Sequence, residues 1–203
     1  YSPGASMMLT PDAVAKASVM FSVSDVAIVT TDIPRDTMLY SANIAHRFGK
    51  PALIDPDCSG ATGEDLSFCD IIAPDAQSAA ELCGWELKTP GDASRAAARL
   101  LARGAGAAAI FLGQRGAVAA TSARQPSVIA PRTGADLSHP HAKSAFVAGL
   151  AWGLALGYNL PQSCWIGLCC ASATNPSAPE AYESFPFVED LVDVQTLETA
   201  NQT

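Results

Sequence analysis

Short apolar runs alternate along this chain with longer segments in which apolar residues recur every three or four positions. The short runs are apolar at successive positions, which is typical of strands buried on both faces of a parallel sheet. The longer segments have the spacing of helices with one apolar face. The pattern predicts strands at 25–30, 51–55, 70–73, 107–112, 117–121 and 127–130, and helices at 9–21, 34–49, 74–84, 91–104, 143–157, 162–174 and from Phe187 onward.

Residues at the predicted boundaries support these elements. Thr10 has the side chain of an N-cap, and Pro11 after it suits the first helical position. Gly84 follows the end of a helix, where a left-handed residue is common. Gly113 and Gly116 enclose a short turn between two strands, which predicts a β-hairpin. The alternation of helices and strands predicts a three-layer α/β fold with a mostly parallel sheet, as a single domain over 1–203.

Composition narrows the classes of partner. Of the 203 residues, 49% are hydrophobic and 16% are charged, and the net charge is −8. An acidic chain without a Lys/Arg run is a poor ligand for nucleic acid or anionic membranes. No apolar run reaches about 18 residues, so no membrane span is expected. The first residues lack a positively charged region, so no signal peptide is expected either.

The six cysteines form neither a disulfide framework nor a zinc pattern. None lies in a C-x-x-C arrangement, and Cys169 and Cys170 are adjacent. Free, buried thiols in a reducing compartment, the cytoplasm or an organelle interior, are therefore expected.

Several polar residues are candidates for chemistry. Asp55 and Asp57 follow a predicted strand, at the end of the sheet where α/β proteins place ligands. Asp75 precedes a predicted helix, where it caps the helix or reaches a metal through water. His139 and His141 flank a proline, but no third ligand lies nearby in the sequence, so a metal site there is not favoured.

Five segments resemble, in their order and in their amino-acid sequences, the C-terminal two-thirds of the ribokinase-like (PfkB) sugar kinases. The segments are "SPGASMMLTPDAVAKA", "DVAIVTTDIPRDTMLYSANIAHRFGKPALIDPD", "DIIAPDAQSAAELCG", "IFLGQRGA" and "AKSAFVAGLAWGLALG". The resemblance implies a Rossmann-like, ribokinase-like fold that lacks the family's N-terminal part and lid. It also implies ATP and magnesium as ligands if the chain is active, and no cofactor otherwise.

The resemblance implies a changed phosphate site. Without gaps, His141, Ala142, Lys143 and Ser144 stand where the family has a Gly-Ala-Gly-Asp turn that holds phosphate and supplies the catalytic base. Ser144 has no basicity near pH 7, so it does not replace a carboxylate base, and helix N-cap is its simpler role. His141 and Lys143 carry side chains where glycines let the backbone approach phosphate, although Lys143 supplies a positive charge.

Two further positions carry over from the family. Asp75 and Ser78 match its Asn-x-x-Glu pair, which helps to organise magnesium, so Asp75 is a weak metal candidate. Gly113 and Gly116 match its Leu-Gly-x-x-Gly hairpin, which runs beside the nucleotide. With His141 and Lys143, these two glycines are the nucleotide-binding candidates.

Three functions stay open. The missing base favours a catalytically degenerate ribokinase-like domain that serves as a structural or interaction subunit. The retained hairpin is compatible with an ATP-dependent sugar or nucleoside kinase that needs an N-terminal portion from elsewhere, or with a nucleotide-binding regulator. In each case the absent strands leave a sheet edge open, so a protein partner or a second copy is expected to cover it.

Overall fold

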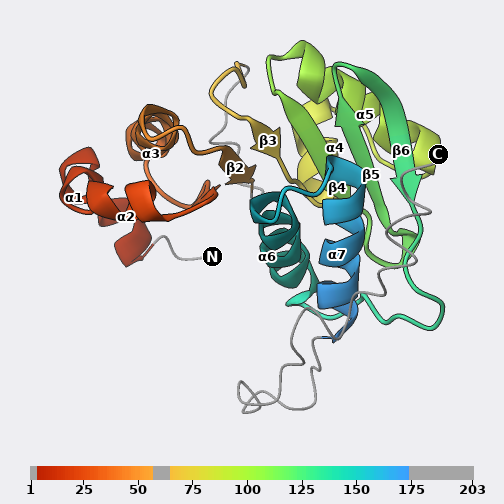
Figure 1. Cartoon of the computed structure of the whole chain (residues 1–203). Coiled ribbons are helices and arrows are strands. Elements are labelled where there is room, and N and C mark those ends of the chain that lie inside the picture. Colours follow the sequence, from red (N-terminus) through yellow and green to blue (C-terminus); the bar gives the residue numbers. More distant parts are fainter. Residues whose placement is uncertain (1–3, 57–64, 174–203) are drawn as a thin grey trace.

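A computed structural model describes residues 4–56 and 65–173 (Figure 1). Asp57, Cys58 and the helix predicted from Phe187 lie outside these residues. The described chain forms a six-stranded sheet in which neighbouring strands follow the order of the sequence. The strands are β1 (Ala27–Thr30), β2 (Ala52–Asp55), β3 (Ile71–Ile72), β4 (Ala107–Phe111), β5 (Ala117–Thr121) and β6 (Arg124–Ile129).

Strands β1 to β4 are parallel, and β5 and β6 add in antiparallel fashion, so the predicted mostly parallel sheet is confirmed. Because successive crossovers have the same right-handed sense, the helices between the parallel strands share one face. These are α3 (Arg35–Arg47), α4 (Ala76–Cys83) and α5 (Pro90–Ala102). Helices α6 (Ala142–Ala155) and α7 (Leu160–Ala173) cover the other face (Figure 1).

Each face of the sheet has its own buried core. Leu53 of β2 belongs to the cluster under α6 and α7, whereas the next residue, Ile54, belongs to the cluster under α3, α4 and α5. Ile71 and Ile72 of β3 divide in the same way. This alternation explains why the strands are apolar at successive positions, and it confirms the three-layer architecture.

Small residues allow α6 and α7 to pack closely. A Cβ on Gly167 would lie 2.6 Å from the carbonyl oxygen of Phe146. A Cβ on Gly149 would lie 2.7 Å from the sulfur of Cys170. The Phe146 ring also stacks on Phe111 of β4, with centroids 5.0 Å apart, so α6 is fixed to both its helical neighbour and the sheet.

The N-terminal segment differs from its prediction. Instead of one helix over 9–21, it forms a 3₁₀ turn, η1 (Ala5–Met8), and two short helices, α1 (Pro11–Lys16) and α2 (Ser18–Val23). Thr10 caps α1 as predicted. Val14 is the only residue of α1 that is buried, and α2 buries none. Helices this short depend on packing for their stability, and little packing is available here.

The described cysteines are free thiols, as predicted: Cys69, Cys164 and Cys169 are buried, and Cys83 and Cys170 are half-buried. Burial raises the pKa of Cys69 and of Cys169 to about 12, and that of Cys170 to about 11. These thiols are therefore protonated at neutral pH and act as small apolar side chains.

Candidate functional site

The predicted site residues lie around the carboxyl ends of β2 and β4 and the start of α6. Asp55 is the last residue of β2, and Gly113 and Gly116 enclose the turn after β4. Asp75 forms a parallel bridge with Phe111, the last residue of β4. The sheet therefore brings these positions together at the carboxyl ends of its parallel strands, which is where open α/β sheets place ligands.

Lys143 connects the start of α6 with the end of β2. Its ammonium lies 2.8 Å from Oδ1 of Asp55 and donates a hydrogen bond of 2.6 Å to the carbonyl oxygen of Pro56. The Lys143 and Asp55 side chains are only 21% and 17% exposed. A carboxylate at this depth needs a countercharge, and the ammonium of Lys143 provides it. Lys143 is thus held against the sheet at the centre of the candidate site.

Ser144 is not the N-cap of α6, so that prediction is wrong. The helix begins at Ala142, His141 is its N-cap residue, and Ser144 is its third residue. The backbone N–H of Ala142 donates to the carbonyl oxygen of His139 at 3.1 Å. This turn through Pro140 leads directly into the helix, which therefore begins one residue before the predicted start at residue 143. Ser144 is exposed, and its hydroxyl lacks the basicity of a carboxylate near pH 7.

Asp75 caps α4, as predicted. Its carboxylate accepts a hydrogen bond of 2.7 Å from the backbone N–H of Ser78. Among residues 4–56 and 65–173, no three His, Cys, Asp or Glu side chains lie close enough together to hold a metal ion. The carboxylates of Asp55 and Asp75 are instead engaged with Lys143 and with the backbone of Ser78.

The hairpin turn has a packing requirement of its own. Gly113 and Gly116 have φ of 59° and 86°, the left-handed region that glycine adopts without strain. A Cβ on Gly116 would lie 2.0 Å from the carbonyl oxygen of Ile129, so no side chain fits there. Gly116 is therefore needed for pairing with β6, whether or not a nucleotide binds beside it.

Three residues that were not predicted to be site residues connect the hairpin turn to neighbouring segments. They are Gln114, Arg115 and Asp136. Gln114 donates a side-chain hydrogen bond of 2.9 Å to Asp136, in the loop before α6. Asp136 also accepts hydrogen bonds from the hydroxyl and backbone N–H of Ser138, and these bonds lower its pKa. Arg115 donates to the carbonyl oxygens of Leu87 and Lys88 at 2.8 and 3.0 Å. The Asp-x-Ser spacing at 136–138, typical of a side-chain turn, was the available sequence signal.

The histidines that flank Pro140 lie in different environments. His139 is buried, and its Nε2 lies 2.8 Å from the carbonyl oxygen of Ala171 in α7. His141 is exposed at the start of α6. His139 therefore anchors the loop to α7.

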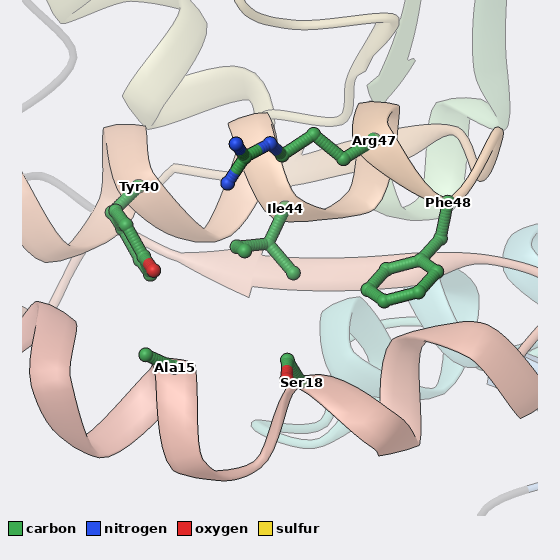
Figure 2. A pocket seen from close by; sticks show the side chains of 6 residues that line it. All are labelled: Ala15, Ser18, Tyr40, Ile44, Arg47 and Phe48. Carbon is green, nitrogen blue, oxygen red and sulfur yellow. The ribbon is translucent and has the colours of Figure 1, made fainter.

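Two grooves, each of about 350 Å³, lie beside α1 and α2, and no predicted site residue lines them. Figure 2 shows the groove beside α3, where Tyr40 and Ile44 of α3, and Phe48 just after it, point toward Ala15 and Ser18. The groove on the β1 side is lined by Thr30, which is the register partner of Asp55 in β2, so it adjoins the strand ends that carry the predicted site.

The shape of the chain is similar to that of solved sugar kinases. A ribokinase from Thermotoga maritima has a TM-score of 0.72 and 20% identity, and the match covers 100% of this chain and 64% of that one. An Arabidopsis thaliana ribokinase solved with ribose and ATP has a TM-score of 0.72 and 18% identity, with 90% and 58% covered. A carbohydrate kinase from Agrobacterium tumefaciens has a TM-score of 0.69 and 17% identity, with 98% and 62% covered.

No protein-family model and no curated protein matches the sequence. The three kinases are all below 25% identity, so they define the fold of the chain, which is ribokinase-like. This chain spans less than two-thirds of the length of each. Within the described residues, no helix is long and apolar enough to cross a bilayer.

Proposed function

We propose that this chain is the nucleotide-side part of an ATP-dependent sugar or nucleoside kinase, which transfers a phosphoryl group to an alcohol together with further polypeptide. The observation that carries this proposal is the arrangement of residues at the carboxyl ends of the strands of a ribokinase-like sheet. There the turn of Gly113 and Gly116 is joined through Gln114 and Asp136 to the loop that leads into α6. The solved ribokinase with ribose and ATP, which matches 90% of this chain, supports the same assignment.

The start of α6 would meet the phosphates of the nucleotide. Backbone N–H groups at a helix N-terminus attract anions, but here the first residues carry side chains in place of glycines. Lys143 is the positive charge at this position, and a phosphate would have to compete for it with Asp55 and Pro56. We therefore expect ATP to bind weakly, with a dissociation constant of about 1 mM or above, equivalent to about −4 kcal/mol.

A degenerate, non-catalytic subunit is the second candidate. It is favoured by one observation, the exposed hydroxyl of Ser144 where a carboxylate base is needed. Both candidates predict that the 203-residue chain alone does not phosphorylate ribose, fructose or adenosine. A turnover of about 1 s⁻¹ in a coupled assay, the low end for kinases, would overturn the non-catalytic candidate and show that the kinase needs no further polypeptide.

An ATP titration followed by NMR distinguishes the two candidates. If the kinase proposal is correct, millimolar ATP will shift the backbone resonances of Gly113, Gly116 and Lys143. Lys143→Met will weaken this response, whereas Lys16→Met, an exposed lysine on α1, will leave it unchanged. Absence of any shift at the hairpin and at α6 would overturn the kinase proposal and leave the subunit function.

A further inference from the structure

Only two charged side chains lie in the central strands and in the helices that cover one face of the sheet. Strands β1 to β5 and helices α6 and α7 contain no Asp, Glu, Lys or Arg apart from Asp55 and Lys143. These two side chains are in contact, with the ammonium 2.8 Å from Oδ1 of Asp55. Each charge therefore has the other as its countercharge in surroundings that are otherwise mostly apolar.

The ammonium of Lys143 has a second contact at the end of β2. It donates a hydrogen bond of 2.6 Å to the carbonyl oxygen of Pro56. The Lys143 side chain is still 21% exposed, so solvent reaches it. An anion at the start of α6 would thus meet an ammonium that is accessible but whose charge is already neutralised by Asp55.

We propose that Asp55 regulates the anion site at the start of α6 by acting as an internal anion, which a phosphate must displace from Lys143. The inference rests on the proposed function, because it concerns the phosphate site of that function. Binding of phosphate and the ion pair between α6 and β2 are alternatives, since both need the same ammonium. Neutralising Asp55 removes the competitor and leaves a net positive charge, so phosphate should then bind more tightly.

The same competition selects the class of ligand. A free carboxylate carries the same single charge as Asp55, so it gains no charge attraction by replacing Asp55, and it loses freedom of motion on binding. Phosphate groups in a diphosphate or triphosphate carry more charge and more acceptor oxygens, so they compete better for the ammonium. The site should therefore accept diphosphates and triphosphates and exclude simple carboxylates.

Inorganic pyrophosphate, without divalent cations, is the probe that tests this proposal. Its binding to the 203-residue chain is followed by NMR at the backbone resonances of Lys143 and Ser144. Asp55→Asn keeps the size of the side chain and should lower the dissociation constant roughly tenfold, between the effects of exposed and buried ion pairs. Lys143→Met should remove the response, and adding Asp55→Asn to it should restore nothing. Acetate should not shift these resonances in the wild-type chain.

Asp32→Asn is the matched control for a general effect of net charge. Asp32 follows β1, the strand that pairs with β2, and it forms no ion pair with Lys143. This variant removes the same charge from the neighbouring strand end, so it should change the dissociation constant by less than about twofold, because water and salt screen charges that are not in contact.

The wild-type chain provides a second measurement that needs no variant. Pyrophosphate should shift the carboxylate ¹³C resonance of Asp55, because its ammonium partner is withdrawn, and should leave that of Asp32 unchanged. An unshifted Asp55 resonance would overturn the proposal. So would equal affinities of the wild-type chain and Asp55→Asn, an equal gain from Asp32→Asn, or no binding of pyrophosphate to either Asp55 form. Pyrophosphate has no sugar or base, so these results are distinct from the ATP-induced shifts at the hairpin, which decide the kinase proposal.

Discussion

The middle of the sheet and its β1 end use similar residues with different results. In β4 and β5 every strand residue except Thr121 is buried, and α5 and α7 cover the two faces. At the β1 end only Val29 of the strand is buried, and α1 and α2 pack against α3 with grooves beside them. Val29 is 5% exposed, whereas Val23, six residues earlier, is 73% exposed. The difference follows from which neighbours are present: β4 and β5 have a strand on each side, whereas β1 has a described strand on one side.

The largest test of this contrast compares two phenylalanines. Phe146 is fully buried between β4 and α7, whereas Phe48 is 41% exposed beside the groove of Figure 2. Phe146→Ala should lower the free energy of unfolding by about 3–5 kcal/mol. Phe48→Ala should lower it by less than about 1 kcal/mol. Urea unfolding followed by circular dichroism measures both, and equal losses would show that the two regions are equally well packed.

A second test compares two glycines with similar φ and different ψ. Gly116 and Gly84 have φ of 86° and 83° and ψ of −135° and 19°, and a Cβ on Gly84 would meet nothing within 4 Å. Gly84→Ala should therefore cost only the left-handed backbone conformation, about 1–2 kcal/mol. Gly116→Ala adds the clash with Ile129, so its total cost should be about 3 kcal/mol or more, again measured by urea unfolding. A similar cost for both would show that β6 moves aside without penalty.

Local sequence signals predicted much of the fold. The cap at Asp75, the left-handed Gly84 and the turn between β4 and β5 each depend on residues within about four positions of one another, and all three are confirmed. The continuous apolar strands likewise predicted burial on both faces. These features were predictable because the interactions that produce them join residues that are close together in the sequence.

The candidate site was less predictable because its contacts join distant parts of the chain. Lys143 was expected to supply charge to a phosphate, but its pairing with Asp55 across 88 positions depends on how α6 packs against β2. Ser144 has the side chain of an N-cap, yet the anchoring of His139 to α7 starts the helix earlier. The sequence shows which residue types are present at these positions, but their roles depend on tertiary packing.

The third test asks how firmly the start of α6 is fixed to the well-packed region. Lys143→Met leaves the carboxylate of Asp55 without its countercharge at 17% exposure, so it should cost about 1–2 kcal/mol, between the values for buried and exposed pairs. Lys88→Met removes an ion pair with Glu86 in which both side chains are more than three-quarters exposed, and it should change stability by less than about 0.5 kcal/mol. Equal effects in thermal unfolding would mean that Lys143 contributes no more than a surface charge.

The smallest effect concerns the start of α5. Thr89 and Asp92 form a capping box there, in which each side chain accepts a hydrogen bond from the backbone N–H of the other residue. Hydrogen bonds from Thr89, and then from Arg95, lower the pKa of Asp92 from 3.8 to about 2. Because the pKa is lower in the folded state, the ionised carboxylate stabilises α5 above about pH 4. That contribution is lost as the pH falls from about 4 to about 2.

Asp92→Asn removes the titrating group at this cap and retains its shape. The unfolding midpoint in urea, measured at intervals from pH 5 to pH 2, should therefore fall less steeply for this variant than for the wild-type chain. Glu81→Gln on α4 is the matched control and should follow the wild-type curve, since its carboxylate caps no helix. The effect should be small, because Asp92 is in contact with water and its hydrogen bonds compete with hydration. If Asp92→Asn leaves the slope unchanged, the capping box does not distinguish the start of α5 from that of α1, where Thr10 caps the helix without a reciprocal carboxylate.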